Sequence, residues 1–550
     1  MAKLVAGEID TTVNFNEEQP AFMTKGGPGD TSTGGNVKTD AWFQSHKLPR
    51  DILDKGTIAQ KAKDQEIFFC DIPFTQLYME IDGNYQPCCF GKGDGKSNIL
   101  NTTMDEWMKG DAMNGIRNDM LNPKAGRQGE YVKKHCTRCL DDEDRYGKSR
   151  RTACMKIHSN DQVFWKKVDN TVKNYIVNGE FEFEERIIEV QLKVYGSECN
   201  LDCYMCMHSN STIRQKVAKE GVWNDKVFGP YNEQAKEFFK WVTRDKTDIL
   251  TEPDVEKDKE GVWTIEMPKL HKKDLEMAKA PITNTESMVD QTMQMSKYIR
   301  SIKVIGGEPL IMKKHYELLD KLIESGDAEH IYLKYQTNLT ETKAGKHNIF
   351  NYIPKFRRVS MVASVDGIGK TIEYMRRRCS WDKIVDNARI SNSYSNVDVD
   401  FNGLVSFLSV MRFYEVIDWC LDEGKDMIDQ INWAMLETPK HMRVNMLPEK
   451  LKKELLPKYE GWPDIQEALR LPAEKDVDLQ ELFDYLLDAD KYYEGTRWQM
   501  HLFDVFPELK EYYVKPEDRE FIFKSDDWLL SSKNPYLSEV VIDKLGEDYA

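Results

Sequence analysis

The region from about residue 187 to 440 alternates β-rich runs with helical ones, and this alternation most constrains the fold. The β-rich runs are IIEVQLKVYG, SIKVIGGE, IYLKYQTNL, VSMVASVDG, VDVDFNGLVSF and INWAMLE. Several are almost continuously apolar and β-branched, as expected of parallel strands buried on both faces. Between two of them, HYELLDKLIESG places Leu318, Leu319, Leu322 and Ile323 on one helical face. Six strand–helix units predict an α/β fold with a parallel, partial (β/α)6 TIM-like barrel rather than a sandwich.

The chain has 550 residues, too many for one compact core, and its composition divides it into several parts. Residues 1–60 are rich in Gly, Thr, Asp and Lys and are expected to form a flexible N-terminal arm. Residues 61–158 form a small cysteine-rich α+β module, and residues 185–440 form the barrel. A charged and mostly helical insertion is expected at about 212–297. Residues 441–550 form a helical C-terminal extension.

Composition narrows the classes of function. Hydrophobic content of 40% and charged content of 31% are typical of a soluble globular protein. The net charge of −16 argues against general nucleic-acid binding and against an anionic membrane surface. We find no apolar run that could span a bilayer and no signal peptide at the start of the sequence. A cytoplasmic protein is therefore expected, with its eleven cysteines as metal ligands or buried thiols rather than disulfides.

Three cysteines, Cys199, Cys203 and Cys206, directly follow the first predicted strand. In parallel barrels the carboxyl ends of the strands carry the chemistry. Three thiolates at this spacing can hold three irons of a [4Fe–4S] cube and leave the fourth iron without a protein ligand. The alternative is a zinc site, which needs four ligands, with His208 available as the fourth.

A glycine pair follows the second predicted strand, SIKVI, in the segment Gly306, Gly307, Glu308 and Pro309. Paired glycines let a backbone approach a ligand closely, and the Glu308 carboxylate suits an ammonium group. Together with Cys-x3-Cys-x2-Cys after the preceding strand, this segment resembles the radical S-adenosylmethionine (SAM) superfamily. Polar residues end the next two strands in the order of that family, and the matching motifs extend over roughly residues 187–440.

The resemblance implies a set of SAM contacts. The glycine-rich segment would hold the methionine amino group, and the end of the fourth strand would supply a polar ribose contact. The residue before the last motif cysteine, often aromatic in the family and near the adenine, is a methionine here. The implied SAM-binding residues are Gly306, Gly307, Glu308, Pro309, Asn338, Ser364, Asp366 and Met205.

The resemblance also implies an activity. SAM would be cleaved reductively at the [4Fe–4S] cluster, giving a 5′-deoxyadenosyl radical that abstracts hydrogen from a substrate. The electron would come from a reductant such as flavodoxin or ferredoxin. A different class of function stays open, namely a non-catalytic binding protein stabilised by zinc or by iron–sulfur clusters.

The N-terminal cysteines resemble the SPASM and twitch modules of radical SAM enzymes, which hold auxiliary clusters. Cys70 is followed by twelve residues, Gly83, four residues and Cys88, and a Cys-x2-Cys pair comes later. The module precedes the barrel here, whereas it normally follows it, and a zinc ribbon on the same ligands stays open. The resemblance implies one auxiliary cluster, expected to be [4Fe–4S], on Cys70, Cys88, Cys136 and Cys139, with Cys89 and Cys154 as second choices.

Two cysteines, Cys379 and Cys420, lie outside both cysteine groups. Cys420 falls on an apolar helical face and is expected to be a core thiol. Cys379 follows Arg376–Arg378, which could activate the thiol, contact the SAM carboxylate or an acidic substrate, or form a solvated turn; the inert thiol is favoured. Enzymes with SPASM or twitch modules often modify peptides or proteins, and others act on sugar alcohols or nucleosides. The pattern most resembles twitch-containing proteins of uncertain substrate, including bacteriophage ones, which would place it in a host cytoplasm.

Overall fold

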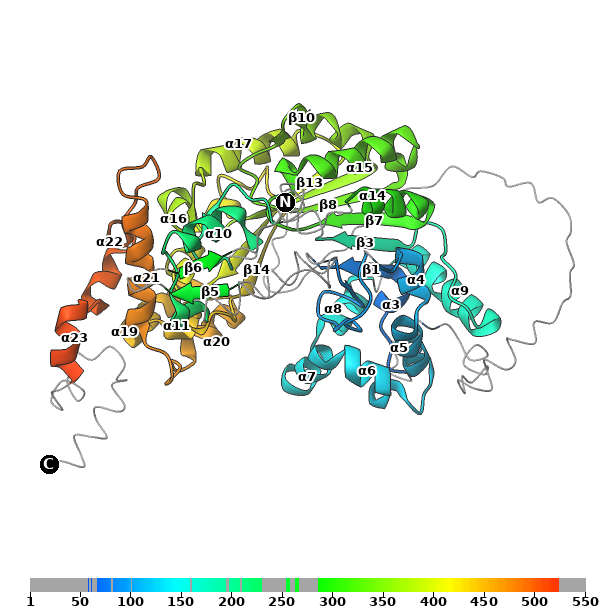
Figure 1. Ribbon diagram of the computed structural model, residues 1–550, viewed down its shortest axis with the longest axis horizontal. Helices are drawn as coiled ribbons and strands as arrows, with labels where there is room; N and C mark the ends of the chain where they lie inside the picture. Colours follow the sequence, from blue (N-terminus) through cyan, green and yellow to red (C-terminus); the bar gives the residue numbers. More distant parts are fainter. Residues whose placement is uncertain are drawn as a thin grey trace, which may run out of the picture.

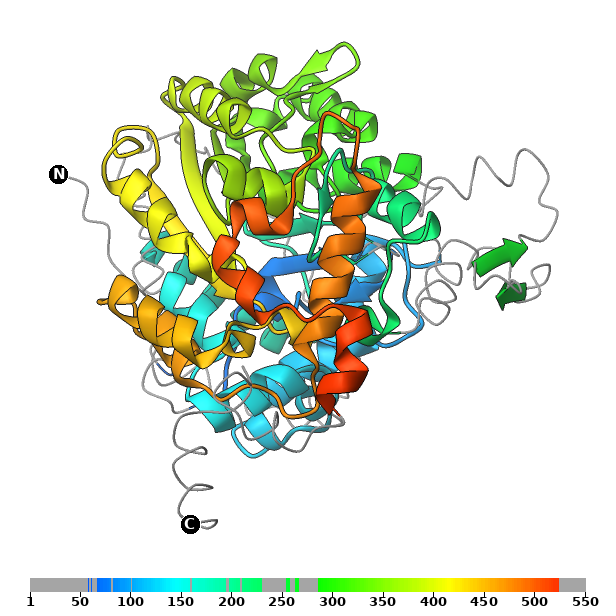
Figure 2. The same ribbon diagram turned by 90° about the vertical axis from the view of Figure 1, so that its left-hand side faces the viewer.

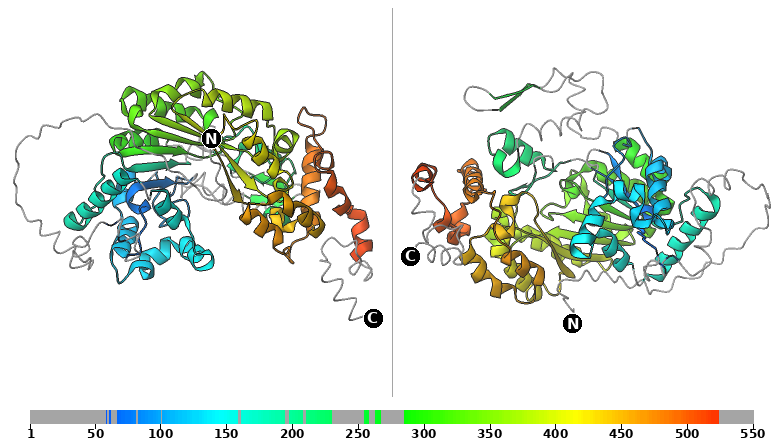
Figure 3. Two further views of the ribbon diagram at one scale, coloured as in Figure 1. Left: turned by 180° about the vertical axis from the view of Figure 1, so that it is seen from behind. Right: turned by 90° about the horizontal axis from the view of Figure 1, so that it is seen from below.

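The computed structural model describes residues 67–80, 83–99, 101–158, 161–193, 197–207, 210–229, 254–257, 263–266 and 285–523, together with Ile58 and Lys61. The predicted flexible arm lies outside these residues except for Ile58. Figure 1 shows a central sheet with helices α3–α9 at one end and the C-terminal helices at the other. Figure 3 shows the same separation from behind and from below.

The central sheet has eight strands in the order β14-β13-β11-β8-β7-β3-β1-β2. Six of them pair in parallel, each beside the next one along this region of the chain. They are β3 (Ile188–Leu192), β7 (Ile299–Val304), β8 (Tyr332–Thr337), β11 (Arg358–Ser364), β13 (Val397–Val405) and β14 (Gln430–Met435). The predicted α/β fold with a parallel sheet is confirmed. Its curvature into a partial barrel stays a prediction.

Helices connect these strands. The chain passes from β7 to β8 through α15 (Lys313–Glu324) and from β13 to β14 through α18 (Phe413–Leu421). Between β11 and β13 it forms α16 (Gly369–Met375) and α17 (Trp381–Asn392). In α15 the buried Leu318, Leu319 and Leu322 bear out the predicted apolar face. Figure 1 shows α15 and α17 along one face of the sheet.

Two of the six strands, β8 and β13, alternate strictly between buried and half-buried residues, which corrects the expectation that they are buried on both faces; in β3, by contrast, four of the five residues are buried. In β13 the burial alternates at every residue, with Phe401 buried and Asp398 and Asp400 on the opposite face. Phe401 stacks on Trp419 of α18 with ring centroids 5.7 Å apart. One face of the sheet is therefore apolar and covered by helices, whereas the other carries polar side chains.

The cysteine-rich region packs directly against the barrel region. Its strand β1 (Gln76–Met79) pairs in parallel with β3 and in antiparallel with β2 (Tyr85–Gln86). Its helices are α3 (Ile72–Thr75), α4 (Met104–Lys109), α5 (Asp111–Leu121), α6 (Glu130–His135), α7 (Thr137–Tyr146), α8 (Arg150–Ile157) and α9 (Gln162–Asn178). The module thus extends the central sheet by two strands. The domain limits given above stay predictions.

The predicted insertion contains two short strands as well as helices. The described elements are α10 (Thr212–Lys219), α11 (Asp225–Phe228), β5 (Asp254–Lys257), β6 (Trp263–Glu266) and α14 (Thr285–Gln294), and β5 and β6 form an antiparallel pair. This antiparallel pair adds strands to a region that was expected to be mostly helical.

The described elements after β14 are helices, as predicted for the C-terminal extension. They include α19 (Glu449–Leu455), α20 (Pro463–Arg470), α21 (Leu479–Tyr492), α22 (Leu502–Val505) and α23 (Pro516–Phe523). Figure 2 shows these orange and red helices in front of the sheet. Within the described part of the chain, every helix is too short or too polar to cross a membrane.

Candidate functional site

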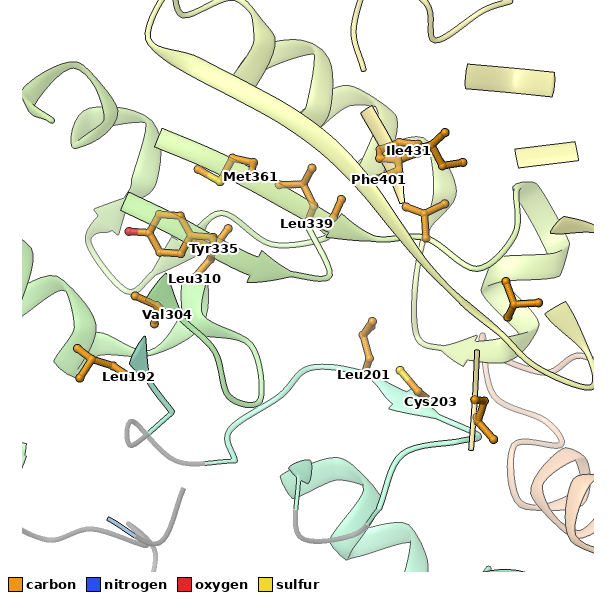
Figure 4. Packing of buried hydrophobic residues seen from close by; sticks show 14 of the residues in the cluster. Leu192, Leu201, Cys203, Val304, Leu310, Tyr335, Leu339, Met361, Phe401 and Ile431 are labelled. Carbon is orange, nitrogen blue, oxygen red and sulfur yellow. The ribbon is translucent and has the colours of Figure 1, made fainter. Parts of the chain in front are cut away.

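The three cysteines of the Cys-x3-Cys-x2-Cys motif lie on one loop after β3, at the carboxyl ends of the parallel strands. The loop includes β4 (Asp202–Cys203), which pairs with β12 (Arg376–Arg377) so that Cys203 lies opposite Arg376. Leu201 is 1% exposed and belongs to the main hydrophobic core. Figure 4 shows Leu201 and Cys203 side by side on this loop. Packing and strand pairing therefore both hold the loop in place.

The three thiols interact electrostatically and are largely buried. Burial, with the neighbouring Cys203 adding to it, raises the pKa of Cys199 to about 12. Burial raises the pKa of Cys203 to about 11, against the lowering effect of Arg376. Burial, followed by the charges of Cys203 and Cys199, raises the pKa of Cys206. Such thiols carry protons near neutral pH, and bound iron would favour their thiolate form because its positive charge offsets the burial.

The three thiols of the predicted donor set come from one loop, with Cys203 buried and Cys199 and Cys206 half-buried. Among the described residues, His, Cys, Asp and Glu side chains form no group of three or more arranged to hold a single metal ion. His208, the candidate fourth zinc ligand, lies outside the described residues. Metal binding by Cys199, Cys203 and Cys206 therefore stays a prediction, which the metal content of the purified protein tests.

The glycine pair lies directly against the cysteine loop. A Cβ atom on Gly307 would come within 2.1 Å of the Glu198 carbonyl oxygen, far closer than any side chain allows. The next backbone N–H, that of Glu308, donates a hydrogen bond to the same oxygen at 2.7 Å. Glycine at 307 is thus required by the close approach of two backbones, and it brings the end of β7 beside Cys199.

The Glu308 carboxylate connects the turn after β7 to the end of β8 through hydrogen bonds. It is fully buried and accepts hydrogen bonds from the Thr337 hydroxyl at 2.7 Å, the Asn338 backbone N–H at 2.7 Å and the Leu310 N–H at 3.1 Å. Burial raises its pKa to about 7, although these donors act in the opposite direction. The proposed ammonium contact would have to share a carboxylate that already has three protein donors.

An amide pair connects the cysteine loop to the end of β8. The Asn338 side chain donates to the Asn200 oxygen at 2.9 Å and accepts from the Thr340 hydroxyl at 2.6 Å. Asn200 in turn donates to the Thr340 hydroxyl at 2.8 Å. Since Asn200 directly follows Cys199, the predicted SAM-contacting Asn338 lies next to the cysteine loop.

The end of β11 carries Ser364 and Asp366. The Ser364 hydroxyl accepts a hydrogen bond from the Gln336 amide at 3.3 Å and is half-buried. The Asp366 carboxylate is fully buried, accepts from the Leu404 backbone N–H at 2.8 Å and forms an ion pair with Arg376 at 2.7 Å. Both Asp366 oxygens therefore have protein partners, and Ser364 is the more accessible of the two expected ribose contacts.

Two neighbouring residues before the last motif cysteine have opposite environments. Tyr204 is buried, and its hydroxyl lies 2.6 Å from the Ser406 hydroxyl after β13. Met205 is half-buried. The predicted adenine contact, Met205, is thus the more accessible of the pair.

Helix α21 of the C-terminal extension braces the cysteine loop. The Tyr485 hydroxyl donates to the Tyr204 carbonyl oxygen at 2.8 Å, and the residue just after the helix, Tyr493, donates to the Asp202 carboxylate at 3.0 Å. Arg377, which follows Arg376 on β12, forms a buried ion pair with Asp490. No motif in the sequence marks these bracing residues.

The polar face of the sheet holds a second group that no motif indicated. Glu189 on β3 accepts hydrogen bonds from Lys334 on β8 at 2.6 Å, Gln76 on β1 at 2.9 Å, Gln191 at 2.7 Å and Ser301 on β7 at 3.1 Å. Burial raises its pKa, but Lys334 and Lys303 outweigh this and hold the pKa well below its ordinary value. The alternation within YLKYQT and VDVDFNGLV was the available signal for this polar face.

The four cysteines predicted to bind the auxiliary cluster line one cavity in the N-terminal module. The cavity contains about 440 Å³ of empty space, part of it open to solvent, and its walls include Phe68, Ile72, Phe90 and Met120. The cysteines that line it are Cys70, Cys88, Cys136 and Cys139. The structure thus brings together residues up to 69 positions apart in the sequence. Their role as ligands stays a prediction.

The remaining cysteines lie elsewhere. Cys154 is buried and lies close enough to Cys70 to raise its pKa, yet neither Cys154 nor Cys89 lines the cavity. Burial raises the pKa of Cys379 to about 12 despite the lowering effect of Arg376, which agrees with the favoured inert interpretation. Cys420 is 1% exposed in the core, as predicted.

Comparisons with known proteins give little guidance. No protein-family model matches the chain, and no curated protein matches it. Two solved structures of SuiB from Streptococcus suis, one bound to the precursor peptide SuiA and one bound to S-adenosylmethionine, are weakly similar. The first covers 74% of this chain and 71% of its own, the second 78% and 74%, both at 12% identity and a TM-score of 0.28. These values assign neither a family nor a function.

Proposed function

We propose that this protein is a radical SAM enzyme. The observation that carries the proposal is the contact of Gly307 and Glu308 with Glu198, which brings the glycine-rich segment against the loop of Cys199, Cys203 and Cys206. A strand-end turn with an open backbone beside three neighbouring thiols is what a site for SAM on a [4Fe–4S] cluster requires.

The bound groups would supply the difficult chemistry: one electron cleaves the carbon–sulfur bond of SAM, leaving methionine and a 5′-deoxyadenosyl radical that removes a hydrogen atom from the substrate. The chain's own residues would hold and orient these groups. Cys199, Cys203 and Cys206 would bind the cluster, and the turn at Gly306–Pro309 would receive the methionine end of SAM. The fold around them would be the partial barrel expected from the sequence.

The N-terminal cavity would hold an auxiliary iron–sulfur cluster on Cys70, Cys88, Cys136 and Cys139. The position of all four cysteines along the wall of one cavity supports this assignment. The electron would come from flavodoxin or ferredoxin, and a peptide or protein is the substrate class we favour, since SPASM and twitch modules commonly accompany such substrates. The cytoplasm, of a host cell if the source is a phage, is the proposed location.

The test is anaerobic reconstitution with iron and sulfide, followed by dithionite and SAM. We expect a brown protein that forms 5′-deoxyadenosine, and loss of that product when Cys199, Cys203 and Cys206 are replaced with Ala. The matched control is Cys420→Ala, which removes a buried thiol of α18 that is not part of the loop and should leave the product unchanged. A colourless zinc protein, or a cluster protein that forms no 5′-deoxyadenosine, would show a binding protein instead.

A further inference from the structure

Arg376 has an unusual position for a residue of a basic run. It follows α16 directly and begins β12, where it lies opposite Cys203 in the antiparallel pair with β4. The Tyr204 backbone N–H donates to the Met375 carbonyl oxygen at 3.0 Å and thereby joins the cysteine loop to the residue just before Arg376. The backbone of Arg376 is therefore held beside the cysteine loop by hydrogen bonds that do not involve its side chain.

The Arg376 guanidinium makes two contacts that together fix its orientation. Its Nη1 lies 3.7 Å from the Cys203 Sγ with the geometry of a donor to sulfur. Its Nε donates to Asp366 Oδ2 at 2.7 Å, and the other Asp366 oxygen accepts from the Leu404 backbone N–H. The Asp366 carboxylate is fully buried, whereas the Arg376 side chain is 13% exposed. Leu404, near the end of β13, thus fixes the Asp366 carboxylate. Asp366 in turn fixes the Arg376 guanidinium beside the Cys203 sulfur.

The adjacent arginine does something different. Arg377 forms its buried ion pair with Asp490 and donates to the Trp498 and Met500 carbonyl oxygens. The basic run is therefore not a single patch. Arg376 is the member directed at a cysteine of the motif, and Arg377 fastens the C-terminal extension.

We propose that Arg376, oriented by Asp366, is a positioning residue that donates a hydrogen bond to the cluster-binding sulfur of Cys203 and raises the reduction potential of the cluster. This inference rests on the proposed function. A cationic donor at a ligand sulfur stabilises the reduced cluster more than the oxidised one, because reduction adds negative charge. Arg376 would thus make the cluster easier to reduce, and this reduction supplies the electron that starts the reaction.

The test is a potentiometric titration of the reconstituted full-length protein, followed by electron paramagnetic resonance. The cluster at Cys199, Cys203 and Cys206 is recognised because SAM changes its signal. In Arg376→Gln we expect a more negative midpoint potential of this cluster. At a fixed potential the ratio of reduced to oxidised cluster should fall about tenfold, which corresponds to a midpoint shift of ~59 mV for one electron. Arg376→Lys, which keeps the charge but loses the planar fork, should shift in the same direction by less.

Two further variants separate this role from a structural one. Asp366→Asn should move the midpoint in the opposite direction, since the guanidinium then lacks its counter-charge. Arg377→Lys, the matched neighbour, should leave the midpoint unchanged. A SAM-responsive cluster with the same midpoint in wild type, Arg376→Gln and Arg376→Lys would overturn the inference alone. A wild-type protein without any SAM-responsive cluster would instead overturn the proposed function.

Discussion

The backbone N–H of Glu308 donates to the carbonyl oxygen of Glu198 across 2.7 Å, joining the turn after β7 to the loop after β3. Gly307 lies at the same contact and has no room for a side chain. The two sequence motifs of this chain, 100 positions apart from Cys206 to Gly306, thus lie against each other. A substitution at this contact should therefore impair the proposed binding of SAM more than it lowers the stability of the fold.

Gly307→Ala should therefore separate the turn from the cysteine loop. The added Cβ would meet the Glu198 oxygen at 2.1 Å, so one backbone must move. We expect formation of 5′-deoxyadenosine to fall about tenfold or more, because a displacement of about 1 Å in a reacting site is costly. The measurement is the rate of 5′-deoxyadenosine formation in the reconstituted protein, with iron content checked first.

The control for that variant is Gly326→Ala. Gly326 follows α15 with a φ of +80°, and a Cβ there meets nothing within 4 Å. The left-handed backbone makes alanine cost about 1 kcal/mol of stability without a clash. If Gly326→Ala reduced 5′-deoxyadenosine formation as much as Gly307→Ala does, the effect would come from stability and not from the contact.

Sequence patterns predicted those features of the structure that depend on residues close together in the sequence. The strand–helix alternation identified six of the seven strands that pair in parallel, and the helical spacing of Leu318, Leu319 and Leu322 identified the face that α15 buries. The cysteine trio and Gly307 were found because closely spaced cysteines and paired glycines are each visible as a short local pattern. Such signatures survive in a single sequence because a few adjacent residues produce them.

Other features depend on residues far apart in the chain and had no such signature. The pairing of β1 with β3 joins segments more than one hundred residues apart, so the cysteine-rich module could not be seen to extend the sheet. The bond from Tyr485 to Tyr204 spans 281 residues. The alternation in VDVDFNGLV indicated a polar face of the sheet. The nearly continuous apolar runs of other strands nevertheless led to the prediction that the strands are buried on both faces.

That polar face predicts a pH effect through Asp400 on β13. Burial, with Asp429 and Asp398 nearby, raises the pKa of Asp400 to about 7. The unfolded chain releases this proton near pH ~4, whereas the folded chain keeps it until about pH 7, so this group lowers stability as pH rises between the two values. Asp400→Asn should therefore stabilise the protein at about pH 7.5 by more than at about pH 5.

Urea midpoints at the two pH values measure this difference. The control is Asp464→Asn on α20, which removes an exposed carboxylate. An Asp400→Asn effect that is the same at both pH values would mean that Asp400 ionises in the folded protein as it does in the unfolded chain.

The cavity in the N-terminal module predicts which cysteines hold the auxiliary cluster. Replacing Cys136 and Cys139 with Ala should lower the iron content by about four atoms per chain if the cluster is a cube. Cys154→Ala removes a buried thiol that does not line the cavity, so the iron content should stay unchanged. Loss of iron in Cys154→Ala with retention in the double variant would reassign the ligands.

The brace from α21 predicts how firmly the cysteine loop keeps its metal. Tyr485→Phe removes the hydroxyl that donates to the Tyr204 carbonyl oxygen and should cost about 0.5–1.5 kcal/mol. Tyr175→Phe is the matched control, since the Tyr175 hydroxyl donates to Asn118 at 2.9 Å within the N-terminal module. Both variants lose a buried tyrosine hydrogen bond, but only the first one touches the loop. We expect a chelator to remove the SAM-responsive cluster faster from Tyr485→Phe than from Tyr175→Phe, and equal rates would mean that the extension does not hold the loop.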